Sequence, residues 1–178
     1  MIKNIKLVVF VLTGFVIFFI LLNALEKNNN YLPEKITNEI ETNFKAELLY
    51  KNEIVSLKDL TQNEDITVIN IWASWCLPCR NEHKYLINLS SINNINLIGI
   101  NYKDSINNAK SFLEELGNPY SQILLDPDGT KSIELGAYGV PETFLLNTKT
   151  RKIIKKYIGP LDDIKFNEIA DIIKNEKF

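Results

Sequence analysis

Hydrophobic residues follow three different patterns along the chain. Leu7 to Leu25 is an uncharged, mostly apolar run of 19 residues, which is long enough to cross a bilayer as a helix. Glu26 to Ile36 is polar, with three consecutive asparagines and a proline, and predicts a tether. Beyond it, short apolar runs alternate with segments of helical periodicity. The sequence therefore predicts a short N-terminus at 1–6, a transmembrane anchor at 7–25, a tether at 26–36 and one domain at 37–178.

Within the domain, β-branched apolar runs predict strands, and apolar positions three or four residues apart predict helices. Val68 to Trp72 and Ile95 to Ile100 are expected to be buried strands, with a helix from Cys79 to Leu89 between them. Strands that alternate with helices and end in a hairpin and a helix indicate an α/β sandwich with a central mixed sheet. The other predicted elements are a hairpin of Phe44–Tyr50 and Glu53–Ser56 around Lys51-Asn52, a helical turn at Leu57–Leu60, a helix at Ser105–Leu116, a strand at Gln122–Leu125, a turn at Asp126–Gly129, a hairpin of Thr143–Leu146 and Lys152–Ile158, and a helix at Leu161–Lys174.

The charges around the apolar run give it a direction. Lys3 and Lys6 precede it, so the positive-inside rule puts the N-terminus in the cytoplasm and the domain outside. A cleaved signal peptide is the alternative. Leu22-Asn23-Ala24 lacks the small-residue pattern of a cleavage site, however, and the run exceeds the usual apolar core of such peptides. We therefore expect an uncleaved, single-pass anchor in the inner (cytoplasmic) membrane, with the domain in an oxidising periplasm. The net charge of −2, with no basic patch, gives no indication of nucleic-acid binding.

Cys76 and Cys79 are the only two cysteines in the chain, and they form a Cys-x-x-Cys pair. A structural zinc site needs about four nitrogen or sulfur ligands, and His83 is the only histidine available. Haem attachment requires histidine directly after the pair, where Arg80 stands. Two cysteines that are adjacent by chance would leave the spacing unexplained. The pair therefore predicts a redox-active disulfide, with no metal and no other cofactor.

The pair lies where a predicted strand meets a predicted helix, and Pro78 suits the first turn of that helix. A helix N-terminus favours negative charge, which lowers the pKa of Cys76 and favours its thiolate, the nucleophilic form. Cys79 lies one turn further and is expected to be more buried. Cys76 is therefore the predicted attacking thiol, and Cys79 the predicted resolving thiol.

Four motifs give this domain a family resemblance. Trp72-Ala73-Ser74-Trp75-Cys76-Leu77-Pro78-Cys79 resembles the active-site motif of the thioredoxin fold. The three others are Cys79-Arg80-Asn81-Glu82-His83, Asn101-Tyr102-Lys103-Asp104 and Tyr138-Gly139-Val140-Pro141-Glu142-Thr143-Phe144-Leu145. With the N-terminal anchor, they resemble the DsbE/CcmG family of periplasmic thiol:disulfide oxidoreductases, which act in cytochrome c maturation. The resemblance runs from about Leu57 to Gly159 and implies a thioredoxin-like fold.

The resemblance also implies roles for single residues. Pro141 matches a cis-proline that faces the cysteine pair and turns the backbone of Val140 toward an extended substrate. Trp75 is expected to cover Cys76 and to offer an aromatic contact surface. Glu82 and Glu142 match acidic residues near the disulfide, where a carboxylate can relay the proton of Cys79.

Two more expectations concern the surroundings of the pair. His83 is interpreted as an exposed or capping residue of the helix, not as a catalytic base. Tyr102-Lys103-Asp104 is expected beyond the end of the Ile95 strand, near the active-site end of the sheet.

The implied partners are apocytochrome c or a cytochrome c maturation protein as the client, and a membrane thiol-reductant protein similar to DsbD or CcdA as the electron donor. A general membrane-tethered reductase similar to TlpA or ResA would share all of this chemistry. A peroxidase of the same fold is disfavoured, because the Cys-x-x-Cys spacing suits dithiol exchange. A non-catalytic module that binds thiols or haem is the alternative from another class.

Overall fold

The computed structural model describes residues 2–26, 44–61 and 65–175. The chain divides into two units, Met1–Lys35 and Ile36–Phe178. The predicted tether at 26–36 lies, apart from Glu26, outside the described residues.

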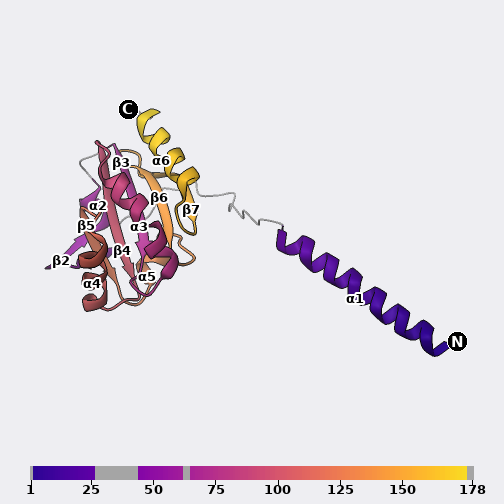
Figure 1. Cartoon of the computed structure of the whole chain (residues 1–178). Coiled ribbons are helices and arrows are strands. Elements are labelled where there is room, and N and C mark those ends of the chain that lie inside the picture. Colours follow the sequence, from indigo (N-terminus) through magenta and orange to yellow (C-terminus); the bar gives the residue numbers. More distant parts are fainter. Residues whose placement is uncertain (1, 27–43, 62–64, 176–178) are drawn as a thin grey trace. The chain divides into compact units, whose positions relative to one another are not determined.

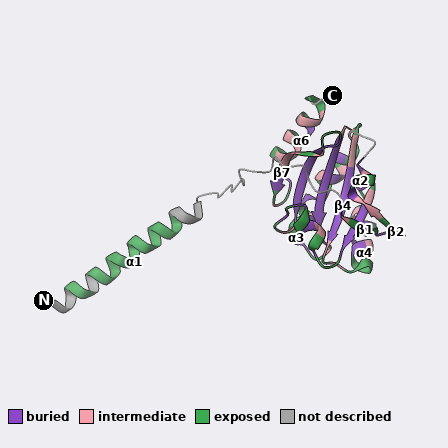
Figure 2. Ribbon diagram, turned by 180° about the vertical axis from the view of Figure 1, so that it is seen from behind, coloured by how far each residue is buried: buried purple, intermediate pink, exposed green. Residues whose placement is uncertain are grey.

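The first unit contains α1 (Ile2–Glu26), a helix of 25 residues (Figure 1). Most of its described residues are exposed (Figure 2), and many of them are apolar, such as Phe10 and Phe15. The predicted anchor at 7–25 falls within this helix. In the part of the chain that the structure describes, no helix reaches the combination of length and apolarity that a membrane span requires.

The described part of the second unit is built on one mixed sheet of seven strands, in the order β2-β1-β5-β4-β3-β6-β7 (Figure 1). β3 and β5 pair parallel to β4, and the other pairings are antiparallel. The expected α/β architecture with a central mixed sheet is therefore confirmed. The strands are β1 (Lys45–Leu48), β2 (Lys51–Ser56), β3 (Ile66–Trp72), β4 (Ile95–Tyr102), β5 (Gln122–Asp126), β6 (Glu142–Asn147) and β7 (Lys152–Ile158).

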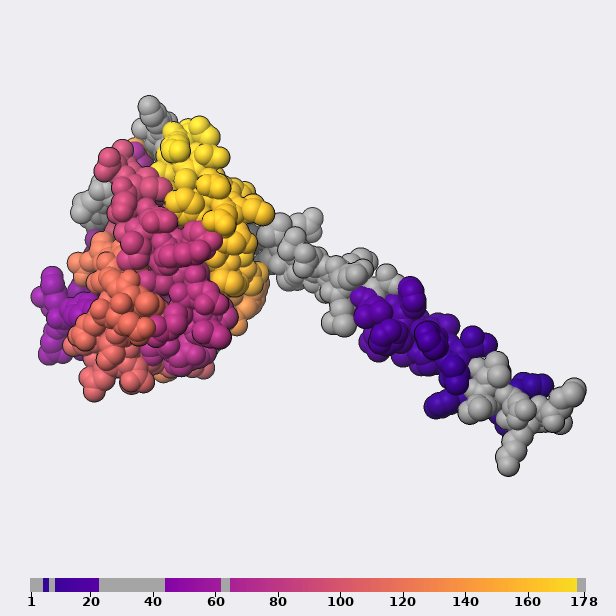
Figure 3. Space-filling view, viewed as in Figure 1, coloured from indigo at the N-terminus to yellow at the C-terminus, as the bar shows by residue number. Residues whose placement is uncertain are grey.

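Helices cover both faces of the sheet. All seven residues of β3 are buried, as a strand must be when both of its faces are covered. On one face, side chains of α3, α4 and α6 pack with Trp72 and Leu97, and α6 lies against α3 (Figure 3). On the other face, Leu57 of α2 and Leu135 at the end of α5 pack with Ile71 and its neighbours. The helices of this unit are α2 (Leu57–Leu60), α3 (Leu77–Ser90), α4 (Ile106–Leu116), α5 (Thr130–Glu134) and α6 (Asp163–Asn175).

Local chemistry explains where α4 begins and ends. The hydroxyl of Ser105 accepts a hydrogen bond from Asn108 N and caps the first turn. Gly117 follows the last residue with a φ of +88°, a conformation that glycine adopts without strain. Between these ends, Ala109, Phe112 and Leu113 are buried on one side. The predicted helix at Ser105–Leu116 is thus confirmed to within one residue.

The turn of the first hairpin differs from the prediction. Lys51 and Asn52 were expected in the turn, but both lie in β2, and the turn is formed by Leu49 and Tyr50. Leu49 is buried in the core and its N–H donates to Ile123 O at 2.9 Å. Burial of this leucine therefore outweighs the turn preference of a lysine-asparagine pair.

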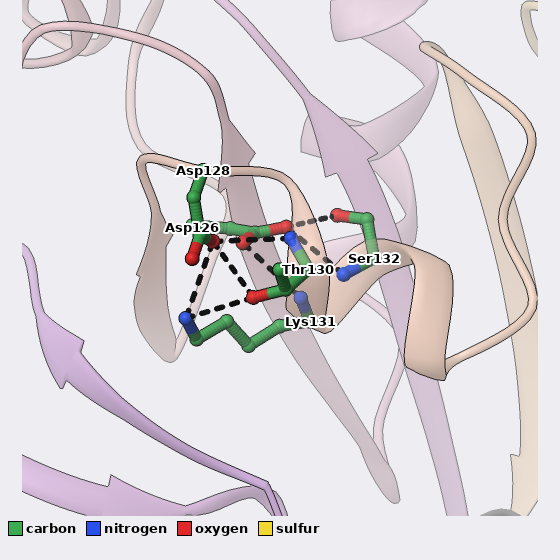
Figure 4. A network of polar contacts seen from close by, with 5 residues as sticks. All are labelled: Asp126, Asp128, Thr130, Lys131 and Ser132. Atoms are coloured by element: carbon green, nitrogen blue, oxygen red, sulfur yellow. Dashed lines mark hydrogen bonds and ion pairs between the residues drawn. The ribbon is translucent and has the colours of Figure 1, made fainter.

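The sequence also gave no prediction of α5, which follows the expected turn after β5. Two aspartates organise it (Figure 4). Asp126, fully buried, accepts hydrogen bonds from Lys131 N, Ser132 N and Ser132 Oγ. Asp128 accepts from Thr130 N and Thr130 Oγ1 and pairs with Lys131 Nζ at 3.3 Å. Carboxylates that bind free N–H groups at a helix start stabilise even a short helix.

Candidate active site

The cysteine pair lies at the junction of β3 and α3, as the sequence predicts. Cys76 and Cys79 form a disulfide with an S–S distance of 2.10 Å and a Cα–Cα distance of 5.3 Å. Cys76 is the N-cap of α3, and its Sγ accepts a hydrogen bond from Cys79 N at 3.1 Å. Pro78 lies in the first turn, where a helix does not need its missing N–H. The Cys76 sulfur is therefore at the positive end of the helix dipole.

The two cysteines are more buried than their neighbours in the sequence. Cys76 is 4% exposed and Cys79 is 1% exposed, whereas Trp75 and Leu77 on either side of Cys76 are 58% and 68% exposed. An exposed tryptophan beside the disulfide agrees with the predicted contact surface. The order of burial agrees with an attacking Cys76 and a resolving Cys79, and the assignment of these roles stays a prediction.

A half-buried aspartate, Asp104, holds the loop before Cys76. Asp104 accepts hydrogen bonds from Ser74 N at 2.6 Å and from Ser74 Oγ at 2.8 Å. Its Oδ2 also accepts from Asn101 Nδ2 at 3.1 Å. The indole N–H of Trp75 donates to Lys103 O at 3.0 Å. Lys103 and Asp104 therefore lie beyond the strand at the active-site end of the sheet, as expected, and their contacts orient Trp75 and Ser74. Tyr102 was expected there too, but it is the last residue of β4.

Glu82 lies one turn after Cys79 on α3, and it is fully buried. Asn70 Nδ2 donates to its Oε1 at 2.9 Å, and Leu161 N donates to its Oε2 at 2.7 Å. Burial raises the pKa of Glu82 to about 7, although both hydrogen bonds favour the ionised form and act in the opposite direction. A carboxyl group with a pKa near neutrality can both accept and return a proton.

The contacts of Glu82 continue into a network that the sequence analysis missed. Asn70 accepts from Tyr120 Oη at 2.8 Å and also donates to Thr143 Oγ1 at 3.1 Å. The ring of Tyr120 stacks on Trp72 with centroids 5.6 Å apart. One signal was present in the sequence: an asparagine inside a strand of buried apolar residues needs a polar partner in the core.

Pro141 follows a cis peptide bond from Val140, so the predicted cis-proline is confirmed. Pro141 is buried and Val140 is half-buried, directly before β6. The carbonyl of Pro141 accepts a hydrogen bond from Gly159 N at 3.0 Å. The contact of Val140 and Pro141 with substrate stays a prediction.

Glu142 is buried as well, but on the other face of the sheet. Successive side chains of a strand point to opposite faces. Thr143 contacts Asn70 on the α3 side, whereas Phe144 packs in the cluster on the opposite side, which is therefore also the side of Glu142. The Oε1 of Glu142 accepts from Tyr138 N at 2.8 Å and Gly139 N at 3.0 Å. The two acidic residues singled out by the sequence thus have separate environments, and a proton-relay role for Glu142 stays a prediction.

His83 differs from the expectation of an exposed residue. It is 3% exposed, its Nε2 lies 2.9 Å from Gly117 O, and its ring meets Phe112 edge-on. Burial lowers the pKa of His83. Helix α4 packs over this side of α3, and the sequence pattern of α3 alone does not predict this contact. In the described residues, no group of three or more histidine, cysteine, aspartate or glutamate side chains is placed to hold a metal ion.

Known structures share this fold. A thioredoxin-like protein from Aeropyrum pernix matches 75% of this chain and 89% of its own, with a TM-score of 0.61 at 16% identity. A DsbF homologue from Corynebacterium diphtheriae matches 72% of this chain and 83% of its own, with a TM-score of 0.61 at 28% identity. The second unit therefore has a thioredoxin-like fold with a disulfide at the start of its first long helix.

The Redoxin family matches residues 35–173, and the chain belongs to this family. Among curated relatives, the thiol:disulfide interchange protein HelX of Rhodobacter capsulatus is 35% identical over 141 residues, which cover 79% of this chain and 78% of HelX. CycY of Rhizobium leguminosarum bv. viciae is 43% identical over 113 residues, 64% of this chain. DsbE of Escherichia coli (strain K12) is 50% identical over 88 residues, 49% of this chain. These matches span 60% of CycY and 46% of DsbE. The resemblance to the DsbE/CcmG family is confirmed.

Proposed function

We propose that this protein is a membrane-anchored thiol:disulfide oxidoreductase that reduces a disulfide in apocytochrome c, or in a cytochrome c maturation factor, so that haem can be attached. The observation that carries the proposal is the Cys76–Cys79 disulfide at the N-terminus of α3 in a chain of the Redoxin family. The names of the relatives, which are thiol:disulfide interchange proteins, support the same chemistry.

The reaction transfers two electrons through a mixed disulfide. In the reduced protein, the Cys76 thiolate attacks one sulfur of the client disulfide. The client S–S bond breaks, a bond forms between Cys76 and the client, and the second client sulfur leaves as a thiolate. Cys79 then loses its proton and attacks Cys76 Sγ, which closes the Cys76–Cys79 bond and releases the other client thiolate. The client is reduced, the protein is oxidised, and the two client thiolates take up two protons.

Glu82 is the group that we assign to the proton of Cys79. It follows Cys79 by three residues, so both side chains lie on one face of α3. Its pKa of about 7 lets it accept the proton when Cys79 must become a thiolate, and return it to a client thiolate afterwards. Glu142 is a second candidate for proton transfer, and Trp75, Val140 and Pro141 are the proposed substrate-binding residues.

The proposed location rests on the N-terminal sequence. The apolar run at 7–25 with Lys3 and Lys6 before it supports an inner-membrane anchor and a periplasmic domain. Thiols in that compartment are oxidised, so a membrane protein similar to DsbD or CcdA is the proposed source of electrons. A general reductase similar to TlpA or ResA remains the second candidate, because it would use the same cysteine pair.

Trapping with Cys79→Ser tests the proposal. Without the resolving thiol, Cys76 should stay bound to its client, and mass spectrometry of complexes from intact cells should identify apocytochrome c or a maturation factor. The Cys76→Ser variant is the matched control and should trap nothing. Trapped clients of unrelated kinds would favour the general reductase, and the absence of any mixed disulfide would favour a non-catalytic binding module.

A further inference from the structure

Lys156 of β7 is a buried cation in a fold that otherwise keeps its lysines at or near the surface in the described residues. Its side chain is 3% exposed. Removing an ammonium group from water is unfavourable unless nearby groups replace its hydration. The groups that replace the hydration of the Lys156 ammonium indicate the role of this residue.

Four contacts surround the ammonium group, which has three N–H donors. The most distant is the ring of Phe144 in β6, with its centre 5.2 Å from Lys156 Nζ, and the other three belong to one segment. Lys156 Nζ donates to Gly136 O at 2.8 Å. It lies 2.8 Å from Glu142 Oε2 and 3.7 Å from the centre of the Tyr138 ring, where the face of an aromatic ring attracts a cation. Gly136, Tyr138 and Glu142 all belong to one segment, residues 136–142, which we call the Pro141 loop.

Glu142 extends this arrangement to the backbone of the loop. Its other oxygen, Oε1, accepts the N–H groups of Tyr138 and Gly139. The ends of the loop have backbone partners of their own, since Ala137 N donates to Ser132 O and Pro141 O accepts from Gly159 N. The middle of the loop, directly before Val140 and Pro141, is therefore folded around the Lys156–Glu142 ion pair.

We propose that Lys156 is a positioning residue that fixes the Pro141 loop in the shape that receives an extended peptide disulfide, and that it thereby determines the preference for peptide over small disulfides. The inference rests on the proposed function, in which Val140 and Pro141 bind the substrate backbone. A small disulfide needs only the two sulfurs at the start of α3, whereas a peptide also needs the loop. The loss of Lys156 should therefore weaken peptide binding far more than the exchange chemistry itself.

The chain offers a matched control in the adjacent residue. Lys155 precedes Lys156 in β7, so its side chain points to the opposite face of the sheet. There it pairs with Glu168 of α6, and both side chains are about 40% exposed. The substitution Lys155→Met removes the same charge from the same strand and leaves the Pro141 loop untouched.

The experiment measures reduction rates of the reduced full-length protein with three probes. Two are synthetic peptides with an intramolecular Cys-x-x-Cys disulfide, one followed by histidine and one not, and the third is hydroxyethyl disulfide. Lys156→Met should lower the ratio of peptide rate to hydroxyethyl disulfide rate roughly ten-fold, through a higher KM with kcat little changed. Lys155→Met should leave this ratio as in the parent.

Two further variants control for misfolding of Lys156→Met and for a different role of the Lys156–Glu142 ion pair. Lys156→Met leaves the Glu142 carboxylate buried and unpaired, so Lys156→Met/Glu142→Gln removes both charges, and it should show the same fall in the ratio. Glu142→Gln alone distinguishes a proton-relay role of Glu142 from a role in positioning the Pro141 loop. If Glu142 only relays a proton, this substitution lowers kcat for all three probes and leaves the ratio unchanged.

An unchanged ratio in the folded double variant would overturn the role of Lys156. A parent protein that reduces neither peptide faster than hydroxyethyl disulfide would overturn it as well. A different outcome would contradict the cytochrome assignment and leave the role of Lys156 standing. In that outcome the parent reduces both peptides equally fast, and Lys156→Met lowers the ratio to hydroxyethyl disulfide for each peptide.

Discussion

The carboxyl group of Glu82 receives its two hydrogen bonds from elements far apart in the chain, Asn70 in β3 and Leu161 before α6. Burial raises its pKa from 4.5 to about 7. Between these pH values the folded protein binds more protons at this site than the unfolded chain does. The contribution of Glu82 to the free energy of unfolding is therefore greatest below pH 4.5, and it is lost as the pH rises through 7.

We expect Glu82→Gln to remove this pH dependence. The shift corresponds to about 3 kcal/mol, which the parent should lose between pH 4.5 and 8 and the variant should not. Urea unfolding of the oxidised protein at a series of pH values measures it. Glu115→Gln is the control, because Glu115 is an exposed partner of Arg80. If the stability curves of parent and Glu82→Gln run parallel, the Glu82 carboxyl does not titrate near neutrality.

At the scale of single residues, the sequence identifies candidate site residues where they belong to a recognisable motif. The motifs singled out Cys76, Cys79, Glu82 and Pro141, and the structure places the first three on or at the start of α3 and gives Pro141 its expected cis peptide bond. Lys156 was not singled out, because its neighbour Lys155 has the same chemistry and a different environment, and only the pairing of β7 with β6 separates the two.

At the scale of elements, α3 brings the disulfide and Glu82 together. Cys76 caps the helix, Cys79 lies in its first turn, and Glu82 lies in the second. The unpaired N–H groups of a helix start stabilise a negative charge at the cap position, and this effect falls off within one turn. The two thiols of the reduced protein therefore differ although only two residues separate them.

The reduced protein should show this difference in alkylation. We expect Cys76 to react with iodoacetamide at pH values well below the pKa of a free thiol, about 8.5, and Cys79 to react only at higher pH. Rates against pH in the variants Cys79→Ser and Cys76→Ser report each thiol alone. Equal profiles would contradict the assignment of attacking and resolving cysteine.

Elements were predictable where hydrophobic periodicity is strong. β3, β4 and α4 have a buried face or are buried throughout, and the prediction placed them within two residues of the structure. α5 has only five residues and depends on side-chain contacts from Asp126 and Asp128. Such contacts have no periodicity, so a pattern of apolar positions cannot reveal them.

At the scale of the whole molecule, the proposed function joins a dithiol domain to an N-terminal segment that keeps it at a membrane. In this proposal, the domain would accept electrons from one membrane protein and pass them to a client in an oxidising compartment. The contribution of the domain to cytochrome c maturation can then be measured as the amount of covalently attached haem.

Deletion of this protein, or Cys76→Ser, should lower covalently bound c-type haem in the source cells and leave b-type haem unchanged, because only the c-type requires reduced client cysteines. Haem staining of membrane proteins and difference spectra measure the two. An added small-molecule thiol should partly restore c-type haem, since it supplies the same electrons. Normal haem staining in the deletion strain would make the cytochrome assignment wrong and favour the general reductase.

The two tryptophans of the chain lie in opposite surroundings, although only two residues separate them. Trp72 is 1% exposed between Phe112 and Tyr120, and Trp75 is 58% exposed with its N–H bound to Lys103 O. An indole in the core emits light at shorter wavelength and is shielded from dissolved quenchers, while an exposed indole is not. The two indoles should therefore report different events: Trp72 fluorescence should follow unfolding, and Trp75 fluorescence should follow the binding of the proposed client at the disulfide.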